Sequence, residues 1–238
     1  MTQRLFLDDS RLTTASATVL NSGPQGVVLD RTIFYARSGG QPGDIGTLHW
    51  ADGEMAVADT LKGEGEAIQH IPAEGSALPP VGTVVEMAID WPRRHRLMRA
   101  HTSMHLLSAV LREAAVTGGS VGVDRSRLDF DLPNPPPKEE IEAGINALIT
   151  ADHPVTTEWV DEAVLDSDPG LVRTLSVKPP RGAGRVRLVR IGTTAEPVDL
   201  QPCGGTHVAR TGEIGPVRVV KMESKGKQNR RIVIAPAE

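Results

Sequence analysis

The chain has 238 residues, of which 39% are apolar and 3% aromatic, and its formal net charge is −4. This composition is typical of a globular protein with a sizeable core and excludes a mainly disordered chain. No run of about 18 apolar residues occurs, and the start, MTQRLFLDDSRL, lacks the layout of a signal peptide, so we expect a cytoplasmic protein with no membrane partner. The single cysteine, Cys203, excludes an internal disulfide.

The charge is unevenly distributed along the chain. Residues 1–170 contain 13 Lys and Arg against 25 Asp and Glu, whereas residues 171–238 contain 13 against 5. A basic C-terminal part on an acidic chain indicates a polyanionic partner such as a nucleic acid, although a solvated charged face would look the same. Because aromatic residues are few, such a partner would be bound through charge and backbone amides more than through base stacking.

Up to about residue 90 the sequence consists of short β-type runs between Gly- and Pro-rich turns, among them the segment SGGQPGD. This pattern predicts a small N-terminal antiparallel β-barrel formed by residues 1–91. The predicted strands are residues 14–20, 26–30, 32–36, 46–50, 55–61 and 83–90.

The pattern changes at Asp90-Trp91-Pro92, where the Asp can cap a helix and the Pro can open it. The following segment, RRHRLMRAHTSMHLLSAVLREAA, has no Gly or Pro and predicts a long helix that stops at Gly118-Gly119. Later segments predict a strand at 127–132 and an amphipathic helix at 138–152. Further strands are predicted at 185–191, 197–200, 215–224 and 230–235. Helices and strands mix without βαβ alternation, so we expect an α+β chain whose residues 92–238 form a two-layer α/β domain.

Four side chains of this second part have the chemistry of a metal site. His101 and His105 are four residues apart, which puts both imidazoles on one face of the predicted helix. Cys203 and His207 flank Gly204 and Gly205, which favour a tight loop over a helix. Three nitrogens and one sulfur suit tetrahedral Zn²⁺. Taken alone, a pair of histidines at this spacing is more often part of the surface or of the core than a metal site. A lone cysteine is most often a small buried hydrophobic residue.

The spacing of HTSMHLL and CGGTH resembles the editing domain of alanyl-tRNA synthetases and the free-standing proteins related to it, the AlaX family. FYARSGGQPGDIGTL resembles the glycine-rich motif of that family's N-terminal barrel. RLDFDL and SKGKQNRRI resemble strands of its editing fold. The resemblance extends from about residue 30 to residue 235.

This resemblance implies a zinc-dependent hydrolase that removes a wrong amino acid, serine or glycine, from the acceptor end of tRNA(Ala). It implies one Zn²⁺ per chain bound by His101, His105, Cys203 and His207. No part of the chain resembles the ATP-binding core of a synthetase, so we expect neither ATP use nor aminoacylation, and we expect no obligate protein partner.

The resemblance also implies roles for residues around the metal. Thr102 would meet the hydroxyl of a misplaced serine, and Gly204 and Gly205 would lie against the substrate. A helical threonine that bonds its own backbone is the alternative for Thr102. The glycine-rich loop would pack over the editing site, although a plain turn would have the same sequence. Basic residues of the C-terminal part would contact acceptor-stem phosphates, although an exposed strand end would look the same. The predicted tRNA contacts are Gly39, Gly40, Gly43, Lys225, Lys227, Arg230 and Arg231.

Two other classes of function remain open. A thiol hydrolase would use Cys203 as the nucleophile and His207 or His105 as the base, and it would need no metal. A module that binds tRNA around a structural zinc would not turn its ligand over.

Overall fold

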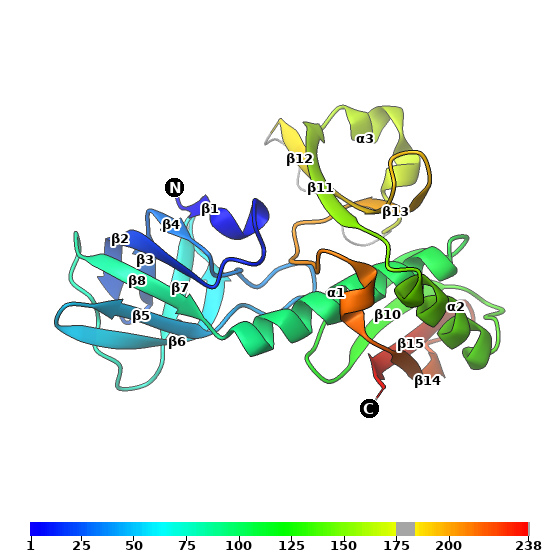
Figure 1. The fold of residues 1–238 in the computed structure, drawn as a ribbon, viewed down its shortest axis with the longest axis horizontal. Coiled ribbons are helices and arrows are strands. Elements are labelled where there is room, and N and C mark those ends of the chain that lie inside the picture. The colour runs from blue at the N-terminus through cyan, green and yellow to red at the C-terminus, as the bar shows by residue number, and fades with distance from the viewer. Residues whose placement is uncertain (175–183, 238) are drawn as a thin grey trace. The chain divides into compact units, whose positions relative to one another are not determined.

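The structure is a computed structural model that describes residues 1–174 and 184–237. Its described residues form two compact units, Met1–Arg96 and the part from Leu97 onward. Figure 1 shows the strands and helices of both units. None of the helices in the described ranges is both long enough and apolar enough to cross a membrane.

A closed six-stranded barrel dominates the first unit (Figure 1), with strand order β2-β3-β7-β6-β5-β8 and antiparallel pairing throughout. The predicted barrel is therefore confirmed. Its strands are β2 (Thr14–Gly23), β3 (Gly26–Leu29), β5 (Gly46–Trp50), β6 (Gly53–Lys62), β7 (Ile68–Pro72) and β8 (Val84–Ile89). Beside the barrel, β1 (Gln3–Arg4) precedes a 3-10 turn (Leu5–Leu7) and pairs in parallel with β4 (Arg31–Thr32).

The barrel core follows from the alternation of apolar and polar residues along the strands. Val19, Leu29, Leu48 and Met87 point inward and are at most 1% exposed. The strand predicted at residues 32–36 is wrong beyond Thr32, because the apolar residues that follow are buried without joining a sheet. Strand β7 was missed because a Pro and a polar Gln-His pair interrupt its short apolar pattern.

The long helix is α1 (Trp91–Val110). The backbone N–H of Arg93 donates to Asp90 Oδ1 at 2.9 Å, so Asp90 caps the helix as predicted. The helix ends earlier than expected, and Gly118-Gly119 lie inside a strand, β9 (Ala115–Ser120), that pairs with β10 (Ser126–Asp131). Sheet pairing here outweighs the helix propensity of the preceding Glu-Ala-Ala.

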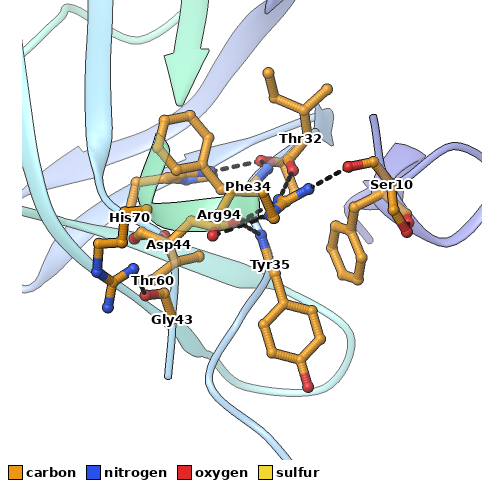
Figure 2. Close-up of polar contacts among 12 residues, drawn as sticks. Ser10, Thr32, Phe34, Tyr35, Gly43, Asp44, Thr60, His70 and Arg94 are labelled. Atoms are coloured by element: carbon orange, nitrogen blue, oxygen red, sulfur yellow. Dashed lines mark hydrogen bonds and ion pairs between the residues drawn. The ribbon is translucent and has the colours of Figure 1, made fainter. Parts of the chain in front are cut away.

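A buried ion pair joins the first turn of α1 to the glycine-rich segment within the first unit (Figure 2). Arg94 Nε lies 3.0 and 2.9 Å from the two carboxylate oxygens of Asp44, and Nη2 also contacts this carboxylate. The remaining guanidinium donors reach the carbonyl oxygens of Ser10 at 2.9 Å and Ile33 at 2.7 Å. Asp44 also accepts the N–H of Tyr35 at 2.6 Å. Every charged atom of the pair therefore has a partner, as a buried pair requires.

The second unit contains two antiparallel sheets (Figure 1). The four-stranded sheet has the order β14-β15-β10-β9, with β14 at Val217–Ser224 and β15 at Asn229–Pro236. Helix α2 (Lys138–Thr150) packs on it, and the Asn146 amide exchanges hydrogen bonds of 2.7 and 2.9 Å with the backbone of Val217. Buried Ile141, Ile145 and Ile149 form its apolar side, in agreement with the predicted amphipathic helix.

The three-stranded sheet has the order β11-β12-β13, with strands at Val155–Asp161, Arg185–Gly192 and Pro197–Pro202. A short helix, α3 (Val164–Ser167), and a 3-10 turn (Pro169–Leu171) supply apolar residues to its core. Strand β11 and helix α3 were not predicted, because most residues of β11 are exposed and give no apolar alternation. The α+β fold class is confirmed.

Candidate metal centre

Helix α1 places His101 and His105 together. The helix is buried on all sides from His101 to Ala109, so both imidazoles lie in the interior of the second unit. Their ring centroids are 5.5 Å apart, as expected for residues one turn apart on one helix face.

The segment after β13 brings Cys203 and His207 to the same point. Cys203 Sγ lies 3.3 Å from Nε2 of His207 and 3.6 Å from Nε2 of His101. The ligand atoms of these residues and His105 all lie within 4.8 Å of one another. Two donors of a tetrahedral zinc, each about 2.0–2.3 Å from the ion, are about 3.3–3.8 Å apart. The two sulfur–nitrogen distances fall in this range. The ligand atoms that are farthest apart need to move only slightly closer to one another to reach it.

Two of the four side chains, Cys203 and His207, have the protonation state of a metal ligand. Burial alone would raise the pKa of the Cys203 thiol, but the charge of the His101 ring and hydrogen bonds from His101 and His105 hold that pKa well below its usual range. Burial lowers the pKa of His207 to about 3. A thiolate and a neutral imidazole are the forms in which these side chains bind metals.

His105 is held from behind by a carboxylate. Its Nδ1 lies 2.7 Å from Asp199 Oδ2, so the Nδ1–H donates to the carboxylate and Nε2 is left to face the cluster. Burial opposes protonation of His105, but Asp199 and the Cys203 sulfur outweigh it and raise the pKa of His105 to about 10 in the absence of a cation. Gln201 Nε2 donates to both oxygens of Asp199 at 2.9 Å.

His207 is held by Thr102, which is fully buried. The Thr102 hydroxyl donates to the carbonyl of Met98 at 2.9 Å, the backbone bond expected for a helical threonine. Its oxygen then accepts the Nδ1–H of His207 at 3.1 Å and the N–H of Val208 at 3.3 Å. Recognition of a serine hydroxyl by Thr102 stays a prediction, and it would require one of these bonds to break.

The loop that contains Cys203 is fixed by a buried arginine. Arg187 Nη1 donates to the carbonyls of Cys203 at 2.8 Å and Gly205 at 3.0 Å. The N–H of Gly205 donates to Cys203 Sγ at 3.4 Å and so stabilises negative charge on the sulfur. Gly204 is exposed, and a Cβ added to it would meet no atom within 4 Å, so the loop is open at this position.

Asp199, Gln201 and Arg187 were missed in the sequence. A signal for two of them exists, because Asp199, Gln201 and Cys203 alternate in the segment VDLQPC and therefore share one face of β13 and its extension. Ligands of a metal are usually hydrogen-bonded by nearby polar side chains, so Asp199 and Gln201 were candidates for this role beside the candidate ligand Cys203.

The three glycines of the predicted tRNA contacts lie in the first unit. Gly39 and Gly40 have φ angles of 55° and 82°, and they form a tight turn closed by hydrogen bonds between Ser38 and Gln41. A Cβ on Gly43 would collide with the backbone of Thr60, so this glycine permits close packing against β6. The described contacts account for these glycines as turn and packing residues, and contact with tRNA stays a prediction.

The four basic residues of the predicted tRNA contacts lie in the β14–β15 hairpin and differ in their surroundings. Arg231 forms two 2.8 Å hydrogen bonds with Asp129, and these bonds hold the pKa of Asp129 below its usual range. Arg230 donates to the carbonyl of Pro133 at 2.7 Å and bonds atoms of the hairpin turn. Lys225 lies 3.8 Å from Glu223. Within the described ranges, Lys227 is exposed and forms no ion pair.

Known families match two parts of the chain. Residues 186–233 match the family described as the threonyl and alanyl tRNA synthetase second additional domain. Residues 7–93 match the class II (A) tRNA synthetases. The first match contains Cys203 and His207, and the second coincides with the barrel.

Individual relatives extend the similarity to nearly the whole chain. The alanine–tRNA ligase of Pyrobaculum arsenaticum is 36% identical over 231 residues, which are 93% of this chain but 25% of that ligase. The alanyl-tRNA editing protein AlaX-M of Methanosarcina acetivorans is 38% identical over 87% of this chain and 86% of its own length. AlaX-M of Methanosarcina barkeri is 37% identical, with 98% of both chains covered. The protein belongs to the AlaX-M family of alanyl-tRNA editing proteins.

Proposed function

We propose that this protein is a trans-editing hydrolase that cleaves the ester between a wrong amino acid and the 3′ end of tRNA(Ala). The observation that carries the proposal is the convergence of His101, His105, Cys203 and His207 in a chain of this family. The wrong amino acids that we propose it removes are serine and glycine. A synthetase pocket that accepts alanine cannot strongly reject a residue that adds a hydroxyl or lacks a methyl group, so a separate hydrolytic site is needed.

The donor set supports zinc as the cofactor, because thiolate sulfur and imidazole nitrogen are typical zinc ligands and four of them suit its tetrahedral geometry. A bound zinc ion would supply Lewis-acid chemistry, polarising a carbonyl or orienting a polar group of the substrate. The chain's own residues hold and orient this centre. Arg187 fixes the loop of Cys203, and Asp199 and Thr102 orient the two histidines.

Substrate binding in this proposal uses the open side of the Cys203 loop at Gly204 and the exposed cations of the β14–β15 hairpin. Lys225 and Lys227 are the proposed phosphate contacts, because they are exposed, whereas Arg230 and Arg231 are half-buried and donate to protein atoms at 2.7–2.8 Å. We propose no aminoacylation activity, because the motifs HTSMHLL and CGGTH, which carry the proposal, resemble an editing domain and not the ATP-binding core of a synthetase.

The direct test is the deacylation of seryl-, glycyl- and alanyl-tRNA(Ala) by the purified protein. The proposal expects rapid loss of serine and glycine and slow loss of alanine. Tight binding of tRNA without any release of amino acid would instead identify a non-catalytic module.

A thiol hydrolase is the second candidate, since Cys203 Sγ lies 3.3 Å from a histidine nitrogen and the pKa of its thiol is lowered. The same assay with a strong chelator separates the two candidates. A thiol hydrolase would keep its rate after the chelator removed all metal, whereas the proposed zinc enzyme would lose it.

A further inference from the structure

Asp199 is a buried carboxylate directly behind one of the four candidate ligands. The residue is 4% exposed, and its Oδ2 accepts the Nδ1–H of His105 at 2.7 Å. A short bond to a buried carboxylate both fixes the plane of an imidazole and makes its other nitrogen a better donor.

The carboxylate is itself held in place. Gln201 donates to both of its oxygens at 2.9 Å, and Arg173 Nη1 lies 3.6 Å from Oδ1. Its backbone lies in β13, paired with Ile191 of β12. Asp199 therefore has little freedom to rotate away from His105.

We propose that Asp199 is a positioning residue for the metal centre: it holds His105 in the tautomer and orientation that present Nε2, and its negative charge makes this nitrogen a stronger donor. This inference rests on the proposed zinc centre.

Thr102 is the neutral counterpart of Asp199: it orients His207 as Asp199 orients His105. The ring of His207 donates its Nδ1–H to the Thr102 hydroxyl, which provides orientation without charge. The two histidines therefore have partners of different kinds, and loss of Asp199 removes both a hydrogen bond and a charge from the centre.

The test measures the zinc affinity of the full chain by competition with a chelator of known affinity. The variants are Asp199→Ala, which removes the acceptor and the charge, and Asp199→Asn, which keeps an oxygen to accept from His105 and removes the charge. Glu196→Gln is the matched control, because it removes an exposed carboxylate from the β12–β13 hairpin. Circular dichroism of the metal-free proteins reports whether each variant folds.

We expect zinc affinity to fall about 10–100-fold in Asp199→Ala, less in Asp199→Asn, and not at all in Glu196→Gln. An Asp199→Ala protein that folds and binds zinc as tightly as the unmodified chain would overturn the inference. If Asp199→Ala does not fold, unchanged affinity in Asp199→Asn would overturn it. Failure of the unmodified chain to bind zinc would instead refute the zinc centre of the proposed function.

Discussion

Among single residues, Thr102 links the helix of the metal centre to its loop. Its hydroxyl bonds the carbonyl of Met98 in α1, the ring of His207 and the N–H of Val208. One donor and two acceptor sites are all that a hydroxyl offers, so each is in use. This arrangement favours a positioning role over direct reading of a serine hydroxyl.

We expect Thr102→Val to slow the deacylation of seryl- and glycyl-tRNA(Ala) by the same several-fold factor. The valine keeps the shape of the side chain but leaves the His207 Nδ1–H and the Val208 N–H without an acceptor. A buried donor without an acceptor lowers the stability of this arrangement by about 1–3 kcal/mol. Rates on the two substrates should be measured in parallel with metal content verified, with Thr102→Ser as the control that retains a hydroxyl. A loss confined to seryl-tRNA(Ala) would show that Thr102 reads the serine side chain.

His70 is a buried histidine of the barrel that the proposed chemistry does not use. Its Nδ1–H donates to the carbonyl of Val27 at 2.9 Å, and its Nε2, 2.7 Å from Thr32 Oγ1, accepts the threonine proton. Burial lowers the pKa of His70 to about 4, with the bond to Val27 opposing the change. The folded protein therefore keeps a neutral His70 at pH values where the unfolded chain, with a pKa of about 6.5, takes up a proton.

The stability contributed by a neutral His70 should be complete above about pH 6.5 and be lost as the pH falls toward 4. A difference from about 6.5 to about 4 corresponds to about 3 kcal/mol at 1.36 kcal/mol per pKa unit. Denaturation of the first unit at pH 7 and pH 4.5 should show a smaller loss in His70→Gln than in the unmodified chain. The same loss in both proteins would contradict this prediction, because other groups would then account for all of the pH dependence.

At the scale of secondary-structure elements, the β14–β15 hairpin combines structural and exposed cations. Asp129, Arg231 and Glu223 occupy neighbouring positions across β10, β15 and β14. Arg231 is therefore flanked by carboxylates, whereas Lys227 at the tip is exposed. We therefore expect mutation of the exposed cations to affect tRNA binding and mutation of the structural cation to affect stability.

The double change Lys225→Ala and Lys227→Ala should weaken tRNA binding and reduce its salt dependence by about one unit of slope for each phosphate that is no longer neutralised, because fewer counterions are released. Arg231→Ala should lower the thermal stability of the second unit with little change in that slope. Binding should be measured over a series of salt concentrations, with circular dichroism to report stability. An unchanged slope in the double variant would show that the RNA lies elsewhere.

The pair of Arg94 and Asp44 connects two elements of the first unit, the first turn of α1 and the glycine-rich segment (Figure 2). Arg94→Met should destabilise this unit by about 3–5 kcal/mol, because it leaves a buried carboxylate without its cation. Arg96→Met is the matched control, since Arg96 is exposed on the same helix. Chemical denaturation of both variants checks the prediction, and equal midpoints would contradict it.

Elements with strong local signals could be predicted from the sequence. The barrel strands with clear alternation, the Asp90 cap and helix α2 are confirmed. Strand β11 could not be predicted, because it is held by pairing with β12 and buries few side chains. The end of α1 was misplaced because Ala115–Ser120 becomes a strand only through its partner, β10.

For the molecule as a whole, the four candidate ligands could be named from residue types and spacing, and the structure brings them together within one unit. Their outer partners could not be named, because Asp199 meets His105 only when the β12–β13 hairpin lies against α1, and Arg187 reaches the Cys203 loop through the pairing of β12 with β13. The sequence alone indicates the candidate metal ligands. The fold is needed to indicate which side chains orient them.

In the proposed function, editing depends on zinc bound by His101, His105, Cys203 and His207. The most direct measurement strips the protein of metal, adds zinc in steps, and records bound zinc together with the rate of seryl-tRNA(Ala) deacylation. We predict that the metal-free protein is inactive and that the rate returns in proportion to bound zinc until one ion is bound per chain. Full activity in a protein shown by elemental analysis to contain no transition metal would contradict the account.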